Sequence, residues 1–600
     1  MIEIALHSFP FATLVFITGY VFFLYRFPKL WLPMVLASMP VLDFAPWTGQ
    51  FFFDEYDALL LLTIAVVSVR QGRFSSRDQD FGWTRISVVL VFGLLISALL
   101  ATLLGAFPFP SLDINSFNDY LSPYNALRVG KGTGFACLLA WLAAADLRQD
   151  MQRTFSHFTL GLVLGVLFAS LAIVWERLSY TGLFNFDSPY RVVGLFSGMH
   201  TGGAYVEGYL VTGLPFVIWW GIHQRHWMAR SAALLIFLTG CYALLVTYAR
   251  GGYLAFILSG LVMFSGLLWR NLDDFKKSYS RIALLVLIIT LFGASFSYTK
   301  TPMHKRFNHL SEDRITRVTH WRQIISIMDG GWKVALFGEG LGKLPLLYAQ
   351  RATADDALSE YRFVKEQNRN VLQLTGGDPL YFEQIVRLNQ NDQYAVTLVA
   401  RNKSPASDIY LTLCRKWMLY AHQCQWFRTT LQPDAQWQTF HYVVKMDEFS
   451  TLPWYSAPTM KLSLENEVAG STAEIASVSL QSPGGSEVLH NGDFSAGSDY
   501  WFFSTDNHLP WHYKNLFLQI YFEQGLLGLT LMLVLLAYSA TILVQRRSEP
   551  DFPAPLLAAA LTGFLTVGLV DSLFDFPRMG MLFYLMLMLI QFQKPLSGKI

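Results

Sequence analysis

Several basic side chains stand at the ends of apolar runs, where a charge must find a partner. They are Arg128, Lys131, Arg177, Arg191, Arg250 and Arg578. A guanidinium binds phosphate oxygens through two parallel hydrogen bonds and stays charged at any working pH. A single residue of this kind could instead pair with Glu176, Asp187 or Asp575, or reach lipid headgroups. The set as a whole indicates a shared anionic ligand such as a diphosphate.

These residues belong to a chain whose composition is far from that of a soluble enzyme. Of its 600 residues, 53% are hydrophobic and only 15% are charged, whereas soluble domains carry about 25% charged residues. The net charge of +2 at pH 7 lacks the basic excess that captures nucleic acid. We therefore expect the chain to lie in membrane lipids, and we do not expect it to bind nucleic acid.

Apolar runs long enough to cross a bilayer, roughly 20 residues each, recur along the chain. They lie near 9–25, 30–46, 56–70, 86–107, 132–146, 157–175, 203–222, 231–248, 252–269, 282–298, 515–544, 555–571 and 579–593. They predict a polytopic α-helical membrane protein with about 12 to 13 transmembrane helices. The first run continues into Arg26 without a cleavage site, so we expect it to remain as an anchor.

Basic residues in the short connections set the orientation, because Lys and Arg are retained on the cytoplasmic side. The basic residues of these connections and of the carboxy terminus fall on one predicted side of the membrane: Arg26, Lys29, Arg70, Arg73, Arg77, Arg148, Arg153, Arg225, Arg230, Lys276, Lys277, Arg546, Arg547, Lys594 and Lys599. The amino terminus and the 299–514 segment are therefore predicted outside the cytoplasm.

Two segments combine an arginine with small neighbours at a predicted span boundary. "YRVVGLFSGMHTGGAYVEGYL" contains the pattern R-x-x-G-x-F, made by Arg191, Gly194 and Phe196. "TYARGGYLAF" places Arg250 before Gly251. Small residues let a ligand or another helix approach the backbone.

A third pattern is split around a soluble insert. "RVTHWRQIISIMDGGWKVALFGEGLG", with Arg317 and Arg322, reads R-x-x-x-W and ends in a G-x-G-x-G turn. "HYKNLFLQIYFEQGLLG", with Lys514, Asn515 and Glu523, follows the insert. Together with the two segments above, these halves resemble the O-antigen ligase and O-antigen polymerase superfamily of lipid-linked glycan transferases.

The resemblance implies inverting, metal-independent glycosyl transfer from a polyprenyl-diphosphate donor on the periplasmic face of the bacterial inner membrane. Arg191 and Arg250 would stabilise charge on the leaving phosphate. The expected substrate-binding residues are Arg128, Lys131, Arg177, Arg317, Arg322, Lys514, Asn515, Glu523 and Arg578. No metal or other cofactor is expected, since the chain has no HExxH and no paired CxxC.

The expected general base is a histidine near the last motif. Many relatives have a His directly before the Asn of that motif, where this chain has Lys514. His512 stands two residues earlier and His508 six earlier. An imidazole, with a pKa near 6.5, suits proton removal from an acceptor hydroxyl, so we expect His512 to be catalytic. Alternatively, it packs at the interface beside Trp511 and Tyr513.

The insert reads as a β-sandwich. From about Asn370, segments such as "YAVTLVARN" and "TMKLSLENE" alternate apolar and polar residues between Pro, Gly, Asn and Asp clusters. "AEIASVSLQSPGGSEVLHNGDFSAGSDYW" resembles carbohydrate-binding jelly-roll modules. Candidate sugar-stacking rings are Trp417, Trp426, Trp437 and Trp454; core packing is the alternative for each.

The predicted organisation has four parts. They are an amino-terminal transmembrane region (1–298), a periplasmic loop with helical segments (299–358), a periplasmic sandwich (359–500), and a carboxy-terminal periplasmic segment with transmembrane helices (501–600). Cys414 and Cys424 lie in the sandwich, where two neighbouring strands could join them in a disulfide.

Two other functions remain open on the sequence alone. A polyprenyl-linked glycan flippase would also need basic residues, although no inverted repeat of the transporter kind is evident. A non-enzymatic glycan-binding assembly factor would use only the insert. The acceptor, whether glycan, lipid or protein, and any partner among polysaccharide-assembly proteins are likewise open.

Overall fold

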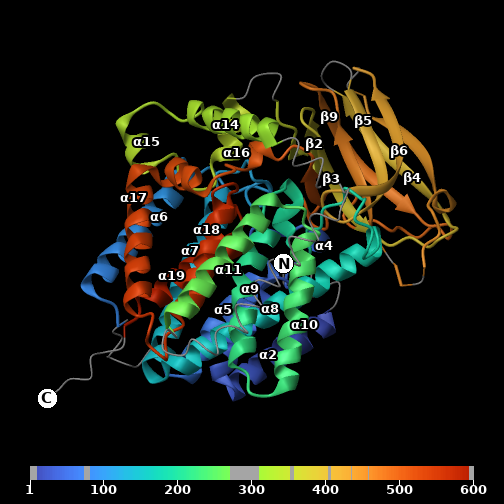
Figure 1. Cartoon of the computed structure of the whole chain (residues 1–600). Helices are drawn as coiled ribbons and strands as arrows, with labels where there is room; N and C mark the ends of the chain where they lie inside the picture. Colours follow the sequence, from blue (N-terminus) through green and yellow to red (C-terminus); the bar gives the residue numbers. More distant parts are fainter. Residues whose placement is uncertain are drawn as a thin grey trace.

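The computed structural model describes residues 10–72, 82–270, 310–351, 357–402, 407–433, 436–453, 455–456 and 458–593. The predicted span 282–298, the residue Trp454, and the basic residues Arg73, Arg77, Lys276, Lys277, Lys594 and Lys599 lie outside these ranges. The described chain forms a helical bundle and, at one end of it, a domain of two sheets (Figure 1).

The helices largely follow the apolar runs. They are α2 (Pro10–Arg26), α3 (Trp31–Ser38), α4 (Ala45–Thr48), α5 (Glu55–Arg70), α6 (Arg85–Ala106), α7 (Asn125–Gln149), α8 (Met151–Tyr180), α9 (Tyr205–His223), α10 (Trp227–Leu245), α11 (Arg250–Arg270), α14 (Leu310–Ser326), α15 (Trp332–Phe337), α16 (Leu344–Arg351), α17 (Leu516–Gln545), α18 (Ala554–Gly568) and α19 (Pro577–Gln591). Short 3-10 turns η2 (Ser197–Thr201), η6 (Leu509–Trp511) and η7 (Leu573–Asp575) lie between them.

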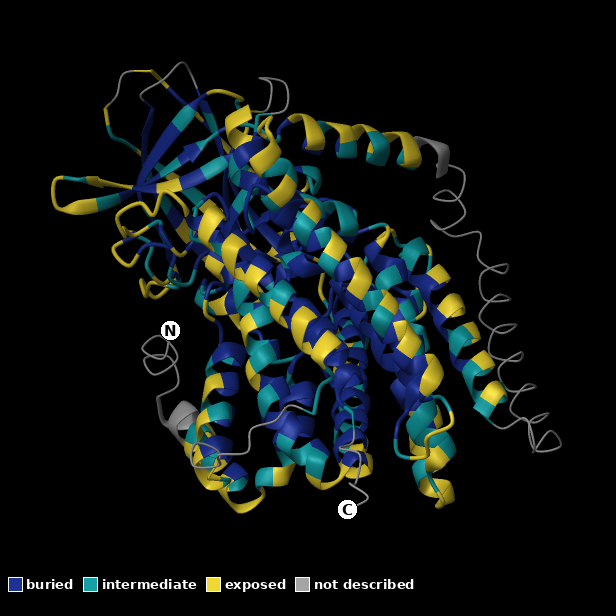
Figure 2. Ribbon diagram, turned by 90° about the vertical axis from the view of Figure 1, so that its left-hand side faces the viewer, coloured by how far each residue is buried: buried dark blue, intermediate teal, exposed yellow. Residues whose placement is uncertain are grey.

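Among the described residues, five helices are long and apolar enough to cross a membrane: α6, α8, α10, α11 and α17. Helix α6 is apolar on both of its faces. It buries Leu90 and Leu94 in the bundle but exposes Val89 and Leu99, at 68% and 60%. Such exposed residues run along the outer helices (Figure 2). A helix that is apolar all round is typical of a membrane span or of a helix covered by other apolar surface.

The predicted span 30–46 is helical only in its first part. Helix α3 ends at Ser38, two residues before Pro40. Because Pro40 has no N–H to continue the helical hydrogen bonds, the helix stops there. The chain then runs irregularly, through the short helix α4, to Asp54, which caps α5 by accepting from the Asp57 N–H.

The insert is built from two five-stranded antiparallel sheets, in the orders β1-β2-β9-β4-β7 and β10-β3-β8-β5-β6. The strands are β1 (Glu360–Glu366), β2 (Arg369–Thr375), β3 (Leu380–Val386), β4 (Gln393–Asn402), β5 (Ser407–Lys416), β6 (Ala421–Leu431), β7 (Gln438–Lys445), β8 (Met460–Asn466), β9 (Thr472–Gln481) and β10 (Phe502–Thr505). Leu398, Leu411, Leu464 and Ile475 have no exposed surface and fill the interior.

Two details of this domain bear on the sequence predictions. Strand β10 lies beyond residue 500, because Phe503 pairs with Phe382 of β3 and completes the second sheet. The sheets therefore extend past the predicted domain end. Cys414 and Cys424 are direct partners across β5 and β6 and form a disulfide.

The turn between β5 and β6 anchors the sheets on the helices. Trp417 is fully buried, and its indole N–H donates to the Gly194 carbonyl at 2.7 Å. Its ring packs against Trp47 and Trp175, with centroids 5.1 and 5.9 Å away. Trp417 is thus a packing residue at the junction, not a free surface for sugar.

We predict that Trp417→Ala weakens this junction. Loss of a fully buried aromatic side chain should lower the free energy of unfolding by about 3 kcal/mol or more. The measurement is thermal unfolding of the purified protein, together with limited proteolysis of the sheet domain. Trp426→Ala, at a side chain 55% exposed, is the matched control, and an equal loss in that variant would contradict the prediction.

Candidate functional site

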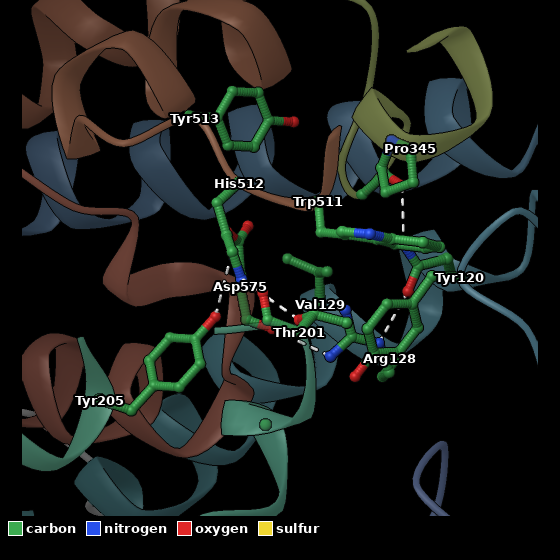
Figure 3. A pocket seen from close by; sticks show the side chains of 13 residues that line it. Tyr120, Arg128, Val129, Thr201, Tyr205, Pro345, Trp511, His512, Tyr513 and Asp575 are labelled. Atoms are coloured by element: carbon green, nitrogen blue, oxygen red, sulfur yellow. Dashed lines mark hydrogen bonds and ion pairs between the residues drawn. The ribbon is translucent and has the colours of Figure 1, made fainter. Parts of the chain in front are cut away.

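A small cavity lies where several irregular segments meet at one end of the bundle. Its walls come from the start of α7, from η2, from the chain around η6, from η7 and from the segment leading into α16 (Figure 3). The lining residues are Tyr120, Asn125, Arg128, Val129, Gly198, Thr201, Tyr205, Gly342, Pro345, Trp511, His512, Tyr513 and Asp575. The cavity therefore contains His512 and Arg128 of the predicted site.

His512 is held at both ring nitrogens. Nδ1 lies 2.8 Å from Asp575 Oδ2, and Nε2 lies 3.1 Å from the Thr201 carbonyl oxygen; Figure 3 draws both residues beside the ring. Because a carbonyl can only accept, Nε2 carries a proton. Tyr205 lies further off, with its hydroxyl 3.5 Å from Nδ1.

The charge state of this pair follows from its burial. Burial, reinforced by the positive charge of Lys514, lowers the pKa of His512 to about 3. Burial also raises the pKa of Asp575 to about 8, against the opposing effect of Arg128. Both groups are then neutral at pH 7, and the Asp575 hydroxyl donates to Nδ1.

Arg128 is committed to the cavity wall. Its Nε donates to Asn125 Oδ1 at 2.7 Å, and its Nη1 donates to the Asp575 carbonyl at 2.9 Å. The guanidinium also lies over the Tyr120 ring, 4.0 Å from its centroid. Arg128 thus positions the η7 turn that carries Asp575.

Four of the predicted cations gather beside the cavity, around the turn between α18 and η7. We call Arg191, Arg250, Arg317 and Lys514 the cationic cluster. An Nη1–H of Arg317 donates to the Val570 carbonyl. The Lys514 ammonium lies 3.6 Å from Asp571 Oδ2. Two cations therefore converge on adjacent residues of one turn.

The other two members reach the same turn through α11 and its neighbours. Arg191 forms an ion pair with Glu207 and donates from Nε to the Thr247 carbonyl at 2.9 Å. Arg250 forms an ion pair with Asp313.

Glycines bring the start of α11 against the turn and against Glu207. A Cβ on Gly251 would come within 2.7 Å of Val570, and one on Gly252 within 3.0 Å of Glu207. Small residues after Arg250 are thus required for this close approach, as expected for helix contacts of this kind.

The two halves of the split motif meet in space. In the turn after α15, the Glu339 N–H donates to the Phe522 carbonyl at 2.7 Å, and the Gly342 N–H donates to Glu523 Oε1 at 2.9 Å. Gly340 has φ +111°, and a Cβ there would lie 2.2 Å from the Gly105 nitrogen. Glu523 therefore holds the glycine turn that borders the cavity.

Asn515 also has a local partner. Its side chain accepts from the Phe517 and Leu518 N–H groups and so caps α17. Its amide donates to the Leu569 carbonyl at 2.9 Å. A side-chain oxygen at this position satisfies backbone donors that have no partner within the helix.

Two further predicted substrate-binding residues are neutralised inside the bundle, apart from the cluster. The Lys131 ammonium lies 2.5 Å from Asp57 Oδ2. Arg578 lies 2.9 Å from Asp54 Oδ2 and donates to the Met39 carbonyl at 2.9 Å. Arg578 thus pairs with Asp54 and not with Asp575.

The remaining two predicted residues also lie outside the cluster. Arg177 is fully buried and donates to the Asn185 carbonyl at 2.6 Å. Arg322 is exposed on α14. The structure thus brings some of the predicted site residues together at the cavity and the cationic cluster. Lys131, Arg177, Arg322 and Arg578 lie elsewhere.

Sequence reasoning did not assign site roles to the acidic residues of this region. Asp571 and Asp575 stand four residues apart in "VDSLFDFPRMG", between two apolar runs. Glu207 is a lone carboxylate in "AYVEGYL", inside another. An ionisable residue inside an apolar run or at its end is a signal for a functional site, and these three could have been found on that ground.

Comparisons with known proteins add little to this geometry. No family model and no curated protein matches the chain. A solved structure described as "CBM4 structure and function" aligns with a TM-score of 0.17 at 14% identity, covering 22% of this chain and 83% of that one. A similarity that weak supports no inference. Within the described ranges, no group of three or more His, Cys, Asp or Glu side chains is placed to hold a metal ion.

The His512–Asp575 pair predicts a specific dependence of stability on pH. The pKa of His512 is lower in the folded protein than in the unfolded chain, where it is about 6.5. Below about pH 6.5 the unfolded chain therefore binds more protons, and the stability of the fold decreases as pH falls. The pKa of Asp575 is raised to about 8 in the folded protein. The stability that Asp575 contributes is therefore present at low pH and is lost as pH rises towards 8. Between about pH 4.5 and 6 the two effects offset each other.

We therefore expect Asp575→Asn to remove an alkaline loss of stability. The Asn amide can donate to His512 as the protonated acid does, but it does not titrate. The difference in unfolding free energy between wild type and variant should shift by about 2 kcal/mol from pH 6.5 to 9, measured by thermal unfolding. Asp329→Asn, at an exposed carboxylate, is the control. A pH-independent difference for Asp575→Asn would refute the neutral pair.

Proposed function

We propose that this protein is a membrane glycosyltransferase of the O-antigen ligase or polymerase type. It would take a glycan from a polyprenyl-diphosphate carrier on the periplasmic face of a bacterial inner membrane. The observation that carries the proposal is the cationic cluster, whose members converge beside a buried cavity lined by His512 and Asp575.

The membrane setting is supported by the exposed apolar faces and by the distribution of charge. Five described helices have the length and composition of membrane spans. Helix α11 begins at Arg250, a member of the cationic cluster, and ends at Arg270. Arg70 and Arg148 likewise lie in the last turns of α5 and α7. Because cytoplasmic ends retain such residues, the opposite ends, where the cluster lies, would face the periplasm.

The cluster suits a diphosphate in its charge and its exposure. Its four cations face three carboxylates, those of Glu207, Asp313 and Asp571. Asp313 is 46% exposed at its side chain, so an anionic ligand could displace it from Arg250. Guanidinium groups would then bind the phosphate oxygens bidentately.

The reaction would need neither nucleotide nor metal. An acceptor hydroxyl attacks the anomeric carbon, the bond from that carbon to the phosphate oxygen breaks, and the electron pair remains on the departing lipid diphosphate. Cations that are already in place stabilise this charge most effectively where little water is present. A nearby base takes the hydroxyl proton.

The sheet domain supports a polymerase more than a ligase. Trp426 is exposed on β6, and its ring lies 6.1 Å from that of Tyr410 on β5. Flat aromatic rings of this kind stack on pyranose faces. A domain that holds a growing glycan beside the donor site would favour repeated addition.

The test is a transfer assay with the purified protein in lipid nanodiscs, a polyprenyl-diphosphate glycan and candidate acceptors, without nucleotide or metal. We expect elongated or transferred glycan. Arg250→Ala should lower kcat/KM by about 100-fold or more, the usual effect of losing one donor to the developing charge. Arg191→Lys should also lower it, because an ammonium lacks the bidentate geometry.

Arg314→Ala is the matched control, since Arg314 is exposed on α14 one turn before Arg317. It should leave the rate unchanged. Donor movement across the bilayer without product would instead indicate a flippase. Binding of free polysaccharide with neither activity would indicate an assembly factor.

A further inference from the structure

His508 is a second histidine beside the site, and its Nδ1 has no hydrogen-bond partner among the described residues. It precedes the η6 turn, and its ring packs against Gly202, where a Cβ would lie 2.5 Å from His508 Cγ. This Nδ1 is buried. A buried polar atom left unpaired costs about 1–3 kcal/mol, so its presence here calls for an explanation.

His512 differs from His508 in its hydrogen bonding. Both of its ring nitrogens are occupied, one by Asp575 and the other by Thr201. Its carbonyl also accepts from His320 Nε2 at 2.7 Å. His512 could accept a substrate proton only by giving up a hydrogen bond that holds it in place.

His508 also lies among the charged groups of the site. The charged and titratable groups facing it are Lys514, His512, Arg191 and Asp571. Two of these belong to the cationic cluster. Burial, reinforced by Lys514, lowers the pKa of His508 to about 3, so the ring is neutral and can accept a proton at pH 7.

Donor binding would strengthen this base. The negative charge of a bound diphosphate would offset Lys514 and Arg191, whose fields oppose protonation of His508. Protonation would then become easier only once the donor is in place. Proton removal from the acceptor would thereby be coupled to occupancy of the donor site.

We propose that His508, and not His512, takes the proton from the acceptor hydroxyl. This inference rests on the proposed function. The acceptor oxygen forms its bond to the anomeric carbon, the lipid diphosphate leaves with the electron pair of the broken bond, and the hydroxyl proton moves to the ring nitrogen of neutral His508 that carries the lone pair. The proton then passes to solvent. His512 and Asp575 are a positioning pair that holds η6, η2 and η7 together.

The experiment compares His508→Ala, His512→Ala and, as a control, His441→Ala in the nanodisc transfer assay, with and without added imidazole. His441 lies exposed on β7. We expect His508→Ala to lower kcat by about 100-fold or more, with donor affinity changed less than about threefold. Free imidazole should restore activity to His508→Ala but not to His512→Ala, because only the former lacks the proton acceptor.

The outcomes separate the two proposals. If wild-type protein makes no product with any acceptor, the proposed function is wrong. If wild type is active and His508→Ala retains its kcat, or imidazole rescues His512→Ala instead, the assignment of His508 is wrong while the transferase stands. Unchanged activity in His441→Ala excludes a general effect of losing a histidine.

Discussion

Charge burial is the physical constraint on which this molecule depends. A cation removed from water costs several kcal/mol unless a carboxylate or carbonyl meets it. Arg578 therefore joins Asp54, and Lys131 joins Asp57, linking α19 and α7 to the start of α5. These pairs fix the helix ends at one side of the bundle. The irregular segments that connect those ends form the cavity.

The same constraint distinguishes structural from functional charges. Arg128 has partners for its guanidinium on Asn125 and Asp575 and so acts as part of the wall. The cationic cluster instead gathers four cations near one turn, with three carboxylates as their partners. An anionic ligand would add negative charge beside these cations. His508, unpaired beside it, fits the same interpretation.

The sheet domain contributes to the site through the segment that carries Arg191. Trp417 donates to the Gly194 carbonyl from one side. Glu176 accepts from the Val193 and Gly194 N–H groups from the other. The chain between Tyr190 and Gly194 is therefore held by the sheets and by α8 together. An insert far away in sequence thus helps to position a residue of the cluster.

The sequence by itself determined the local features of this protein. Apolar runs located most helices, alternation located the sheets, and glycine and arginine patterns marked the segments that meet at the site. Each of these depends on neighbouring residues only. The proline that stops α3 was also readable, but its consequence for the predicted span 30–46 was missed. Strand β10 was missed because its pairing partner lies about 120 residues earlier.

Only the tertiary structure decided which charges meet. Arg578 had Asp575 nearby in sequence but pairs with Asp54, and Lys514 pairs with Asp571. His508 and His512 look alike in "NHLPWHYKN", yet one is unpaired and the other is held by Thr201 and Asp575. The physical reason is that electrostatic and hydrogen-bond energies depend on distance and burial in space, and folding sets both between residues that are hundreds of positions apart.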